Sequence, residues 1–294
     1  MKRIACLFKI LFFILFVTSV ASSCDPPRDD KYIGIQLWSV RGDMSADPEG
    51  TLRALGEMGY SFVEAAGYSN GMLYGMEPET FTSLVEASGM DFVSSHIGRE
   101  LPAEEDWDEA MQWWETAIDA HARAGAGYIV QPFMPSSAFE SLDILQQWAD
   151  YFNAIGELAQ ARGLRFGFHN HAIEFTTVEN RVAYDFLLEN TDPGLVFFQL
   201  DLYWLEVGRD EGVGYCEDYL QNYPGRFLMY HVKDREEVGA SGEMDFRPAF
   251  ENADIAGLRY VIVEVEQYNY EPLESVRISL DYLLDADYVR ADYR

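Results

Sequence analysis

The amino-acid sequence predicts a single (β/α)8 barrel. From residue 31 onward, short runs rich in β-branched and aromatic residues alternate with longer amphipathic stretches, which is typical of a parallel sheet with crossover helices. Eight such units within a chain of 294 residues favour a closed barrel over an open, doubly wound sheet. The first run is followed by neither GxGxxG nor GxxxxGKS/T, which counts against a nucleotide-binding sheet.

The eight expected strands are short and mainly apolar, and several carry polar residues late in the run. In chain order they cover residues 32–38, 61–67, 91–96, 127–133, 164–171, 195–204, 226–234 and 258–267. The stretches between them have helical periodicity, and two of the longest end at Gly125 and Gly163, as helix C-termini often do. The aromatic stripe at residues 107–118 is typical of a helix packed against a barrel.

Residues 1–24 have the layout of an export signal. Three basic residues precede an apolar stretch at residues 10–20, which is too short for a comfortable membrane span. The small residues before Cys24 resemble a bacterial lipoprotein cleavage site, and ordinary signal-peptidase cleavage is the alternative. We therefore expect an exported lipoprotein, held at the membrane only by lipid on Cys24 and facing the periplasm or cell surface. Residues 25–31 would form a tether, and residues 32–294 the barrel domain.

Charge and cysteine content narrow the range of partners. The chain has 50 acidic and 21 basic residues, giving a formal net charge of −29 at pH 7. A surface of this sign repels nucleic acid and anionic lipid headgroups, so we expect no nucleic-acid partner. Only Cys24 and Cys216 would remain after processing, so a disulfide framework is not expected.

Ion-binding and proton-transferring side chains gather at the ends of the last four expected strands. In barrels of this class the active site lies at the carboxyl ends of the strands. Residues i and i+2 of a strand share a face, so the polar residues of each run point the same way. These residues are His169, His171 and Glu174 on the fifth run, Gln199, Asp201 and Tyr203 on the sixth, His231 and Lys233 on the seventh, and Glu264 and Glu266 on the eighth.

Such a cluster needs a partner of opposite charge. Buried carboxylates and imidazoles are costly unless they are paired or bound to an ion. Aspartate, histidine and glutamate from three separate strands therefore indicate one divalent metal ion, and this mixed nitrogen and oxygen ligation suits Mn, Co, Zn or Mg.

The segments FHNHAIEF, QLDLYW, YHVKD and VEVEQYNYEP, in this order, resemble the xylose-isomerase-like TIM barrel family. More narrowly, they resemble its exported sugar phosphate isomerase/epimerase members. The resemblance covers about residues 31–290 and implies a metal bound by Glu, Asp, His and Glu from the fifth to eighth strands. It implies that Asp201, His231 and Glu266 are metal ligands.

The first ligand is where the chain departs from that pattern. Many members of the family have Glu-Asn-His at the end of the fifth strand, whereas this chain has His169, Asn170 and His171. Either His169 replaces the carboxylate or Glu174 reaches in from the following loop. We favour Glu174, because its carboxylate would restore the family's charge balance.

The resemblance implies an isomerase or epimerase that removes the proton next to the metal-bound carbonyl of a keto sugar. His169 or His171 would be the base, Glu266 a ligand or second base, and Lys233 an oxyanion stabiliser. The alternative is a lyase or hydratase that acts on 3-keto-glycosides by β-elimination. Trp204 stands where some ketose epimerases carry a histidine, which counts against simple ketose epimerisation, and histidines beside the metal fit the alternative at least as well.

Six further residues at strand ends are candidates for binding the sugar: Gln36, Trp38, Glu64, His96, Gln131 and Trp204. Aromatic rings at a barrel mouth can stack on the apolar face of a pyranose, although ordinary packing would also explain the two tryptophans. His96 could equally be a hydrogen-bonded core histidine, and Glu64 and Glu264 could pair with arginines.

Two other functions fit the sequence less well. A sugar-binding lipoprotein without catalysis needs no trio such as Asp201, His231 and Glu266. An apurinic-site endonuclease, which shares this barrel, needs a basic DNA groove and more than the 5 histidines present. We expect unphosphorylated substrates, because the sequence has no phosphate-binding loop and an exported enzyme rarely meets sugar phosphates.

Overall fold

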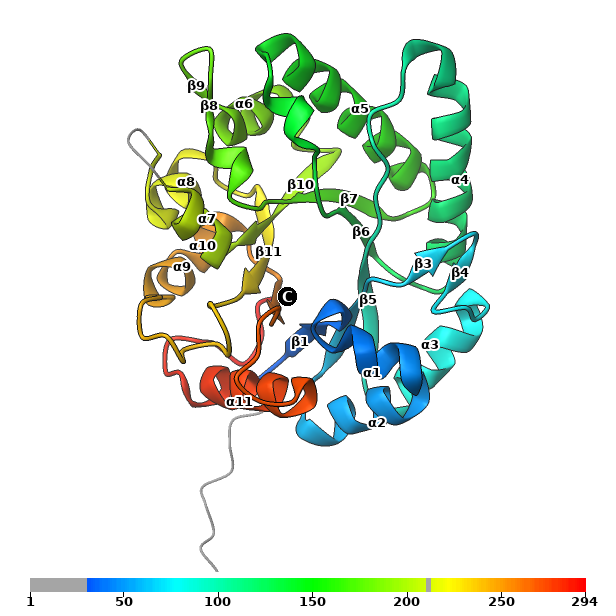
Figure 1. Ribbon diagram of the computed structural model, residues 1–294, viewed down its shortest axis with the longest axis vertical. Helices are drawn as coiled ribbons and strands as arrows, with labels where there is room; N and C mark the ends of the chain where they lie inside the picture. Colours follow the sequence, from blue (N-terminus) through cyan, green and yellow to red (C-terminus); the bar gives the residue numbers. More distant parts are fainter. Residues whose placement is uncertain (1–30, 210–212) are drawn as a thin grey trace, which may run out of the picture.

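The eight predicted runs form a closed barrel of parallel strands in the computed structural model, which describes residues 31–209 and 213–294. Figure 1 shows the strands around the centre and the helices outside them. In spatial order the strands are β1 (Ile33–Gln36), β12 (Tyr260–Val263), β11 (Phe227–Val232), β10 (Val196–Asp201), β7 (Arg165–His169), β6 (Tyr128–Gln131), β5 (Asp91–His96) and β2 (Phe62–Ala65). Because β1 pairs with both β12 and β2, the ring is closed, and the predicted (β/α)8 barrel is confirmed.

Helices cover the outside of the barrel. The two longest, α4 (Trp107–Arg123) and α5 (Leu142–Ala161), are followed by Gly125 and Gly163 with φ values of 75° and 80°, as the sequence predicted. The other helices are α1 (Arg41–Ala46), α2 (Pro48–Met58), α3 (Pro78–Ala87), α6 (Ala183–Asn190), α7 (Leu202–Gly208), α8 (Cys216–Asn222), α9 (Arg247–Glu251), α10 (Ala253–Ala256) and α11 (Pro272–Asp285).

Among the described residues, short 3-10 turns and hairpins lie in the loops that follow the strands. They are four 3-10 turns, η1 (Leu37–Val40), η2 (Glu104–Asp106), η3 (Ser136–Phe139) and η4 (Ile173–Phe175), and two hairpins, β3 (Tyr68–Ser69) with β4 (Met72–Leu73) and β8 (Thr177–Val178) with β9 (Arg181–Val182).

Several strands are shorter than the sequence predicted, most clearly β10. This strand ends at Asp201 instead of continuing to Trp204, and α7 begins at the next residue. The cause is local, because the side chain of Asp201 accepts a hydrogen bond from the amide of Trp204 at 2.7 Å and so caps the new helix. Trp204 therefore lies on a helix and not on the strand face.

Apolar side chains fill the barrel interior near the amino ends of the strands. This cluster consists of Phe62, Val93, Val130, Phe197, Leu228, Met229 and Ile262. Two strand glycines make room for its rings. A Cβ atom on Gly34 would lie 2.2 Å from the Phe62 ring, and one on Gly167 would lie 2.5 Å from the Phe197 ring. The interior is thus apolar and closely packed at the end opposite the predicted site.

The last residues of the chain pack over the end of the barrel at which the strands begin. The guanidinium of Arg294 lies 3.5 Å from the centroid of the Tyr32 ring, and the amide of Tyr32 donates to the carbonyl of Ala291 at 2.7 Å. Figure 1 marks the carboxyl terminus near the middle of the ring of strands. Among the described residues, no helix is both long and apolar enough to cross a membrane. The export signal, Cys24 and all but the last residue of the tether lie outside the described residues, and they stay predictions.

Candidate active site

The carboxylate of Glu64 lies at the centre of a buried polar layer. Its Oε1 atom accepts hydrogen bonds from Gln36 Nε2 at 2.8 Å and from His231 Nε2 at 2.6 Å. Its Oε2 atom accepts from Ser94 Oγ at 2.6 Å and from Gln199 Nε2 at 2.8 Å. These donors come from β1, β11, β5 and β10, so one buried carboxylate joins strands around the whole barrel.

Histidines balance the charge of this carboxylate. Burial alone would raise the pKa of Glu64, but His96, whose Nε2 lies 3.0 Å from Oε1, and His231 lower it well below its usual value. Burial alone would lower the pKa of His231, but Glu64 and Glu264 raise it to about 10. The Nδ1 atom of His231 lies 3.1 Å from Glu264 Oε2. The alternative that Glu64 and Glu264 pair with arginines is therefore wrong.

Four buried side chains next to this layer bring ligand atoms together. His169, Asp201, His231 and Glu264 each offer one atom, and these atoms lie within 4.8 Å of one another. The Oδ1 atom of Asp201 caps α7, whereas Oδ2 is buried without a hydrogen-bond partner among the described residues. Burial, reinforced by the Glu264 charge, raises the pKa of Asp201 to about 8. Two imidazoles and two carboxylates, one with an unpaired buried oxygen, fit a divalent cation.

Register explains why these residues meet. Asp201 lies opposite His231 where β10 pairs with β11, and His169 lies opposite Gln199 where β7 pairs with β10. Gln199 turns its Nε2 atom to Glu64, so its Oε1 atom is left to accept from Nδ1 of His169 at 3.1 Å. Because Nδ1 of His169 is engaged in this hydrogen bond, Nε2 is the ring nitrogen that is suited to bind a metal.

Glu264 takes the position that the sequence prediction gave to Glu266. The last strand ends at Val263, but the amide of Glu264 still donates to the carbonyl of Val232 at 3.2 Å, which keeps Glu264 beside His231. Glu266 is further along the departing chain, where its Oε2 atom lies 2.9 Å from Lys233 Nζ. Of the two glutamates, Glu264 and not Glu266 belongs to the cluster of ligand atoms that includes Asp201 and His231.

Glu174 is also placed differently from the preferred prediction. It lies on η4 after β7, and its Oε2 atom accepts a hydrogen bond from the backbone amide of His171 at 2.8 Å. This local bond holds its carboxylate apart from the four-residue cluster, whose fifth-strand member is His169. Burial raises the pKa of Glu174 to about 7. The imidazole of His169 therefore stands where the family resemblance expected a carboxylate.

A cavity of about 400 Å³ lies at the mouth of the barrel, and we call it the mouth cavity. Its lining includes five predicted site residues, namely Trp38, His96, His169, His171 and Glu266. Ala66, Pro132, Phe133 and Glu264 complete the wall. The rings of Trp38 and Phe133 are 45% and 40% exposed, so two apolar surfaces remain available to a ligand.

His171 lines the mouth cavity but does not belong to the cluster of His169, Asp201, His231 and Glu264. Burial, the largest effect, lowers its pKa, so the ring is neutral and able to accept a proton. Its backbone is held by Glu174, and its ring lies 5.7 Å from that of Trp204. Lys233 is buried close by, with Nζ 5.0 Å from the Tyr203 ring and 5.4 Å from the Trp204 ring.

Two predicted sugar-binding residues serve the backbone and the polar layer instead. Gln36 donates to Glu64 and accepts from the amide of Trp38 at 3.0 Å. Gln131 donates to the carbonyl of Phe133 at 2.8 Å and accepts from the amide of Arg99 at 3.2 Å, so it ties two loops together. Both side chains are fully buried and neither lines the mouth cavity.

Sequence reasoning named Gln199 among the polar residues of the sixth run but gave it no role, and it missed Ser94 and Phe133. The strand period was the available signal for Ser94, which shares a face with His96. Phe133 lies in the loop after β6, where no such period applies.

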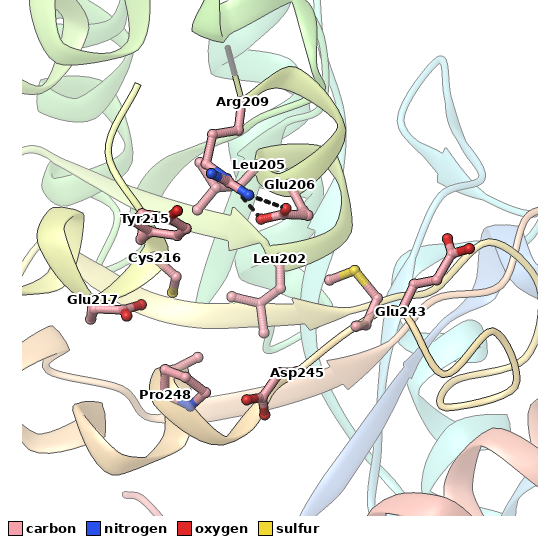
Figure 2. Close-up of a pocket in the computed structure, with 12 residues that line it drawn as sticks. Leu202, Leu205, Glu206, Arg209, Tyr215, Cys216, Glu217, Glu243, Asp245 and Pro248 are labelled. Carbon is pink, nitrogen blue, oxygen red and sulfur yellow. Dashed lines mark hydrogen bonds and ion pairs between the residues drawn. The ribbon is translucent and has the colours of Figure 1, made fainter. Parts of the chain in front are cut away.

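A separate cavity of about 280 Å³ lies between α7, α8 and residues 243–249 (Figure 2). Arg209 pairs with Glu206 there and lies over the Tyr215 ring, 4.2 Å from its centroid. The Cys216 thiol also lines this space, but burial raises its pKa strongly, so the reactive thiolate is disfavoured. The four clustered ligand residues do not line this cavity.

Comparison with known proteins supports the barrel fold and identifies its family. The family model for the xylose isomerase-like TIM barrel matches residues 52–286. The chain belongs to this family. Within it, a sugar phosphate isomerase/epimerase from Parabacteroides distasonis is 30% identical, with a TM-score of 0.82 over 88% of this chain and 100% of that one. The resemblance to this family that the sequence indicated is confirmed, and the protein is of the sugar isomerase/epimerase-like kind.

More distant relatives extend the comparison. An inosose dehydratase from Clostridium perfringens is 26% identical over 170 residues, which cover 48% of this chain and 55% of that enzyme. The chain thus spans about half the length of the curated relatives that it matches. The IolI protein with a bound zinc atom is 14% identical, with a TM-score of 0.67 over 88% of this chain and 98% of that one, and it shows a shared fold.

Proposed function

We propose that this protein is a divalent-metal-dependent enzyme that removes the proton beside the carbonyl group of a keto sugar or sugar derivative. One observation carries the proposal. Four buried donors, one with an unpaired oxygen, converge next to the mouth cavity, and the neutral imidazole of His171 faces the same cavity without belonging to the donors. A purely sugar-binding protein has no need of this combination.

The chain's residues have distinct roles in the proposal. His169, Asp201, His231 and Glu264 would hold the cation, which would polarise the substrate carbonyl and stabilise the charge that develops on its oxygen. His171 takes the proton from the adjacent carbon, and the electron pair of the broken C–H bond passes towards the carbonyl.

Glu266 and Lys233 would complete the wall of the reaction site. Glu266 lines the mouth cavity and is paired with Lys233, whose ammonium is otherwise enclosed by the Tyr203 and Trp204 rings. The pair is neutral overall, and in the proposal the ammonium of Lys233, behind Glu266, would help to balance negative charge on a substrate oxygen.

β-Elimination is the outcome that we favour. The pair of electrons from the C–H bond then becomes a C=C bond, while the bond from the β-carbon to its oxygen breaks and that oxygen takes the proton from His171 and leaves as water or an alcohol. This reaction needs only one base to take the carbon-bound proton. His169 replaces the glutamate expected on the fifth strand, and the curated relatives are dehydratases of inosose, both of which support this outcome.

Epimerisation is the second candidate. It is supported by the sugar phosphate isomerase/epimerase from Parabacteroides distasonis, which is similar over nearly the whole chain. In that case the proton returns to the opposite face of the same carbon, and Glu266 is the group at the cavity wall best placed to deliver it. For either outcome we propose an unphosphorylated substrate, because no arginine or lysine lines the mouth cavity within the described residues.

The test is to incubate the protein, loaded in turn with Mn, Co, Zn or Mg, with ketoses and 3-keto-glycosides in D2O. NMR follows deuterium at carbon and release of the leaving group. Deuterium uptake without a released group would indicate epimerisation, and release of the group would indicate elimination. The Asp201→Asn variant is the matched control, and we expect it to do neither. If the wild-type protein shows neither reaction with any metal, the proposal fails.

A further inference from the structure

We infer that the mouth cavity continues past Trp38 into a second sugar-binding compartment, so that the substrate is a disaccharide or a longer glycoside and not a single sugar. This inference rests on the proposed function, because it assumes that the reacting sugar occupies the mouth cavity. It adds the class of substrate and a second binding region.

The first observation is that two cavities share a wall. A space of about 340 Å³, which we call the outer cavity, lies beside the mouth cavity, and both are lined by Trp38 and Ala66. Pockets for small molecules usually span roughly 300–1,000 Å³, so each space alone is near the lower limit of that range. A ligand crossing the Trp38 edge would use both.

The chemistry of the outer cavity suits a second sugar ring. Met44, Pro48 and Tyr74 give it an apolar wall, and Arg41 and Ser45 add polar groups at its edge. A pyranose has the same combination, with apolar C–H faces and a rim of hydroxyls. No carboxylate lines this space in the described part of the chain, so a neutral sugar meets no anionic side chain that would have to be desolvated.

Arg41 is fixed in a position that leaves donors for the ligand. Its Nη1 atom donates to the carbonyl of Trp38 at 3.0 Å and to the hydroxyl of Tyr268 at 2.8 Å, and its guanidinium lies 4.9 Å from the Trp38 ring centroid. The Nε and Nη2 atoms make no hydrogen bond to any described residue. A guanidinium fork held in this way can donate to neighbouring hydroxyls at little further entropic cost.

The walls that the two cavities share are also rigid. The amide of Trp38 is held by Gln36, and the amide of Ala66 donates to the hydroxyl of Tyr74 at 3.0 Å. Gly67 permits this contact, because a Cβ atom there would lie 2.6 Å from the Tyr74 ring. The two residues that border both cavities are therefore held by hydrogen bonds before a ligand arrives.

The experiment compares one-ring and two-ring ligands by calorimetry, without requiring turnover. Methyl glucosides serve as one-ring probes, and trehalose, maltose and cellobiose as two-ring probes. We expect at least one disaccharide to bind about tenfold or more tightly than its one-ring counterpart, a difference of about 1.4 kcal/mol. The Ser45→Trp variant, at an exposed position, should fill the outer cavity and remove this advantage while one-ring affinity stays the same.

A second variant guards against misfolding of the first. Arg41→Met removes the donor fork and should likewise lower only two-ring affinity. If no disaccharide binds more tightly than its one-ring counterpart, or if both variants keep the wild-type preference, the inference is overturned. Its failure is distinct from failure of the proposed function. Deuterium exchange on one-ring ketoses alone would leave the function standing, whereas tight disaccharide binding without any exchange would leave only the compartment.

Discussion

Glu64 Oε1 and His231 Nε2 are 2.6 Å apart, although the two residues are separated by 167 positions in the chain and lie on β2 and β11. The other ring nitrogen of His231 points to Glu264. A carboxylate that binds one imidazole nitrogen fixes the ring and directs the other nitrogen towards a cation. In the proposed metal site, Glu64 would therefore position the ligand His231 without being a ligand itself.

We predict that Glu64→Gln lowers the affinity for Mn or Zn by roughly 10–100-fold, because the amide cannot accept from His231 and His96 as a carboxylate does. Calorimetric titration of the metal-free protein measures this change. Ser94→Ala is the matched control, since it removes one hydrogen bond from the other oxygen of Glu64 and leaves His231 untouched. Equal metal affinity in folded Glu64→Gln and wild-type protein would refute the positioning role.

Two glutamates of one strand end should separate binding from chemistry. Glu264→Gln removes a carboxylate from the four-residue cluster, and we expect metal affinity to fall by more than about 100-fold. Glu266→Gln changes a residue paired with Lys233, so metal affinity should change by less than about threefold while turnover falls. Metal titrations of the two variants decide the matter, and the reverse order would restore Glu266 as the ligand.

Gly167→Ala should destabilise the barrel by about 1–3 kcal/mol, because the new methyl group would lie 2.5 Å from the Phe197 ring. Urea unfolding measures the change. Gly127→Ala is the control, since no atom lies within 4 Å of the place that its methyl group would take, and we expect a change of no more than about 0.5 kcal/mol. Equal stability of the two variants would contradict the close packing of the barrel interior near the amino ends of the strands.

His121 should make stability depend on pH. Burial lowers its pKa from 6.5 to about 4, so below pH 6.5 the unfolded chain binds a proton that the folded protein does not. This contribution is complete above pH 6.5 and is lost as the pH falls towards 4, by roughly 3 kcal/mol in total. Urea unfolding with a chelator present, at pH 7.5 and pH 4.5, should show a smaller loss for His121→Asn than for the wild type. Parallel losses would rule out this linkage.

Lipid attachment at Cys24 is also open to a direct test. In cells given labelled palmitate, the wild-type protein should become labelled and should be found in the membrane fraction. The Cys24→Ala variant should remain unlabelled. Cys216→Ser is the control, because that residue lies within the barrel domain and should not affect labelling. Labelling that survives Cys24→Ala would mean that the N-terminal segment is not a lipoprotein signal.

The sequence was sufficient for the barrel because strand period and spacing repeat eight times, and small errors in each boundary do not alter the order of strands. The same period predicted that Asp201 and His231 lie near each other, and the two residues are opposite each other where β10 pairs with β11. Outside a strand this reasoning has no basis. Glu264 and Glu266 follow the last residue of β12 and have the same parity, so only the backbone path beyond Val263 distinguishes them.

Loop residues were the least predictable part of the site. The position of Glu174 is decided by one hydrogen bond to the amide of His171, which depends on a 3-10 turn that the sequence does not signal. Trp204 was assigned to a strand because the run LVFFQLDLYW is continuous, whereas a helix cap at Asp201 ends the strand early. Local capping thus overrode an apolar run.

The polar layer around Glu64 has a consequence for how the site comes into being. Its members extend from Gln36 on the first strand to Glu264 after the last, and neither half of the chain holds more than a fraction of them. A fragment with four strands could fold its local helices and still have no place for an ion. In the proposed site, uptake of the ion would therefore require that β1 has paired with β12. Metal binding would then mark a late step in refolding experiments, namely closure of the barrel.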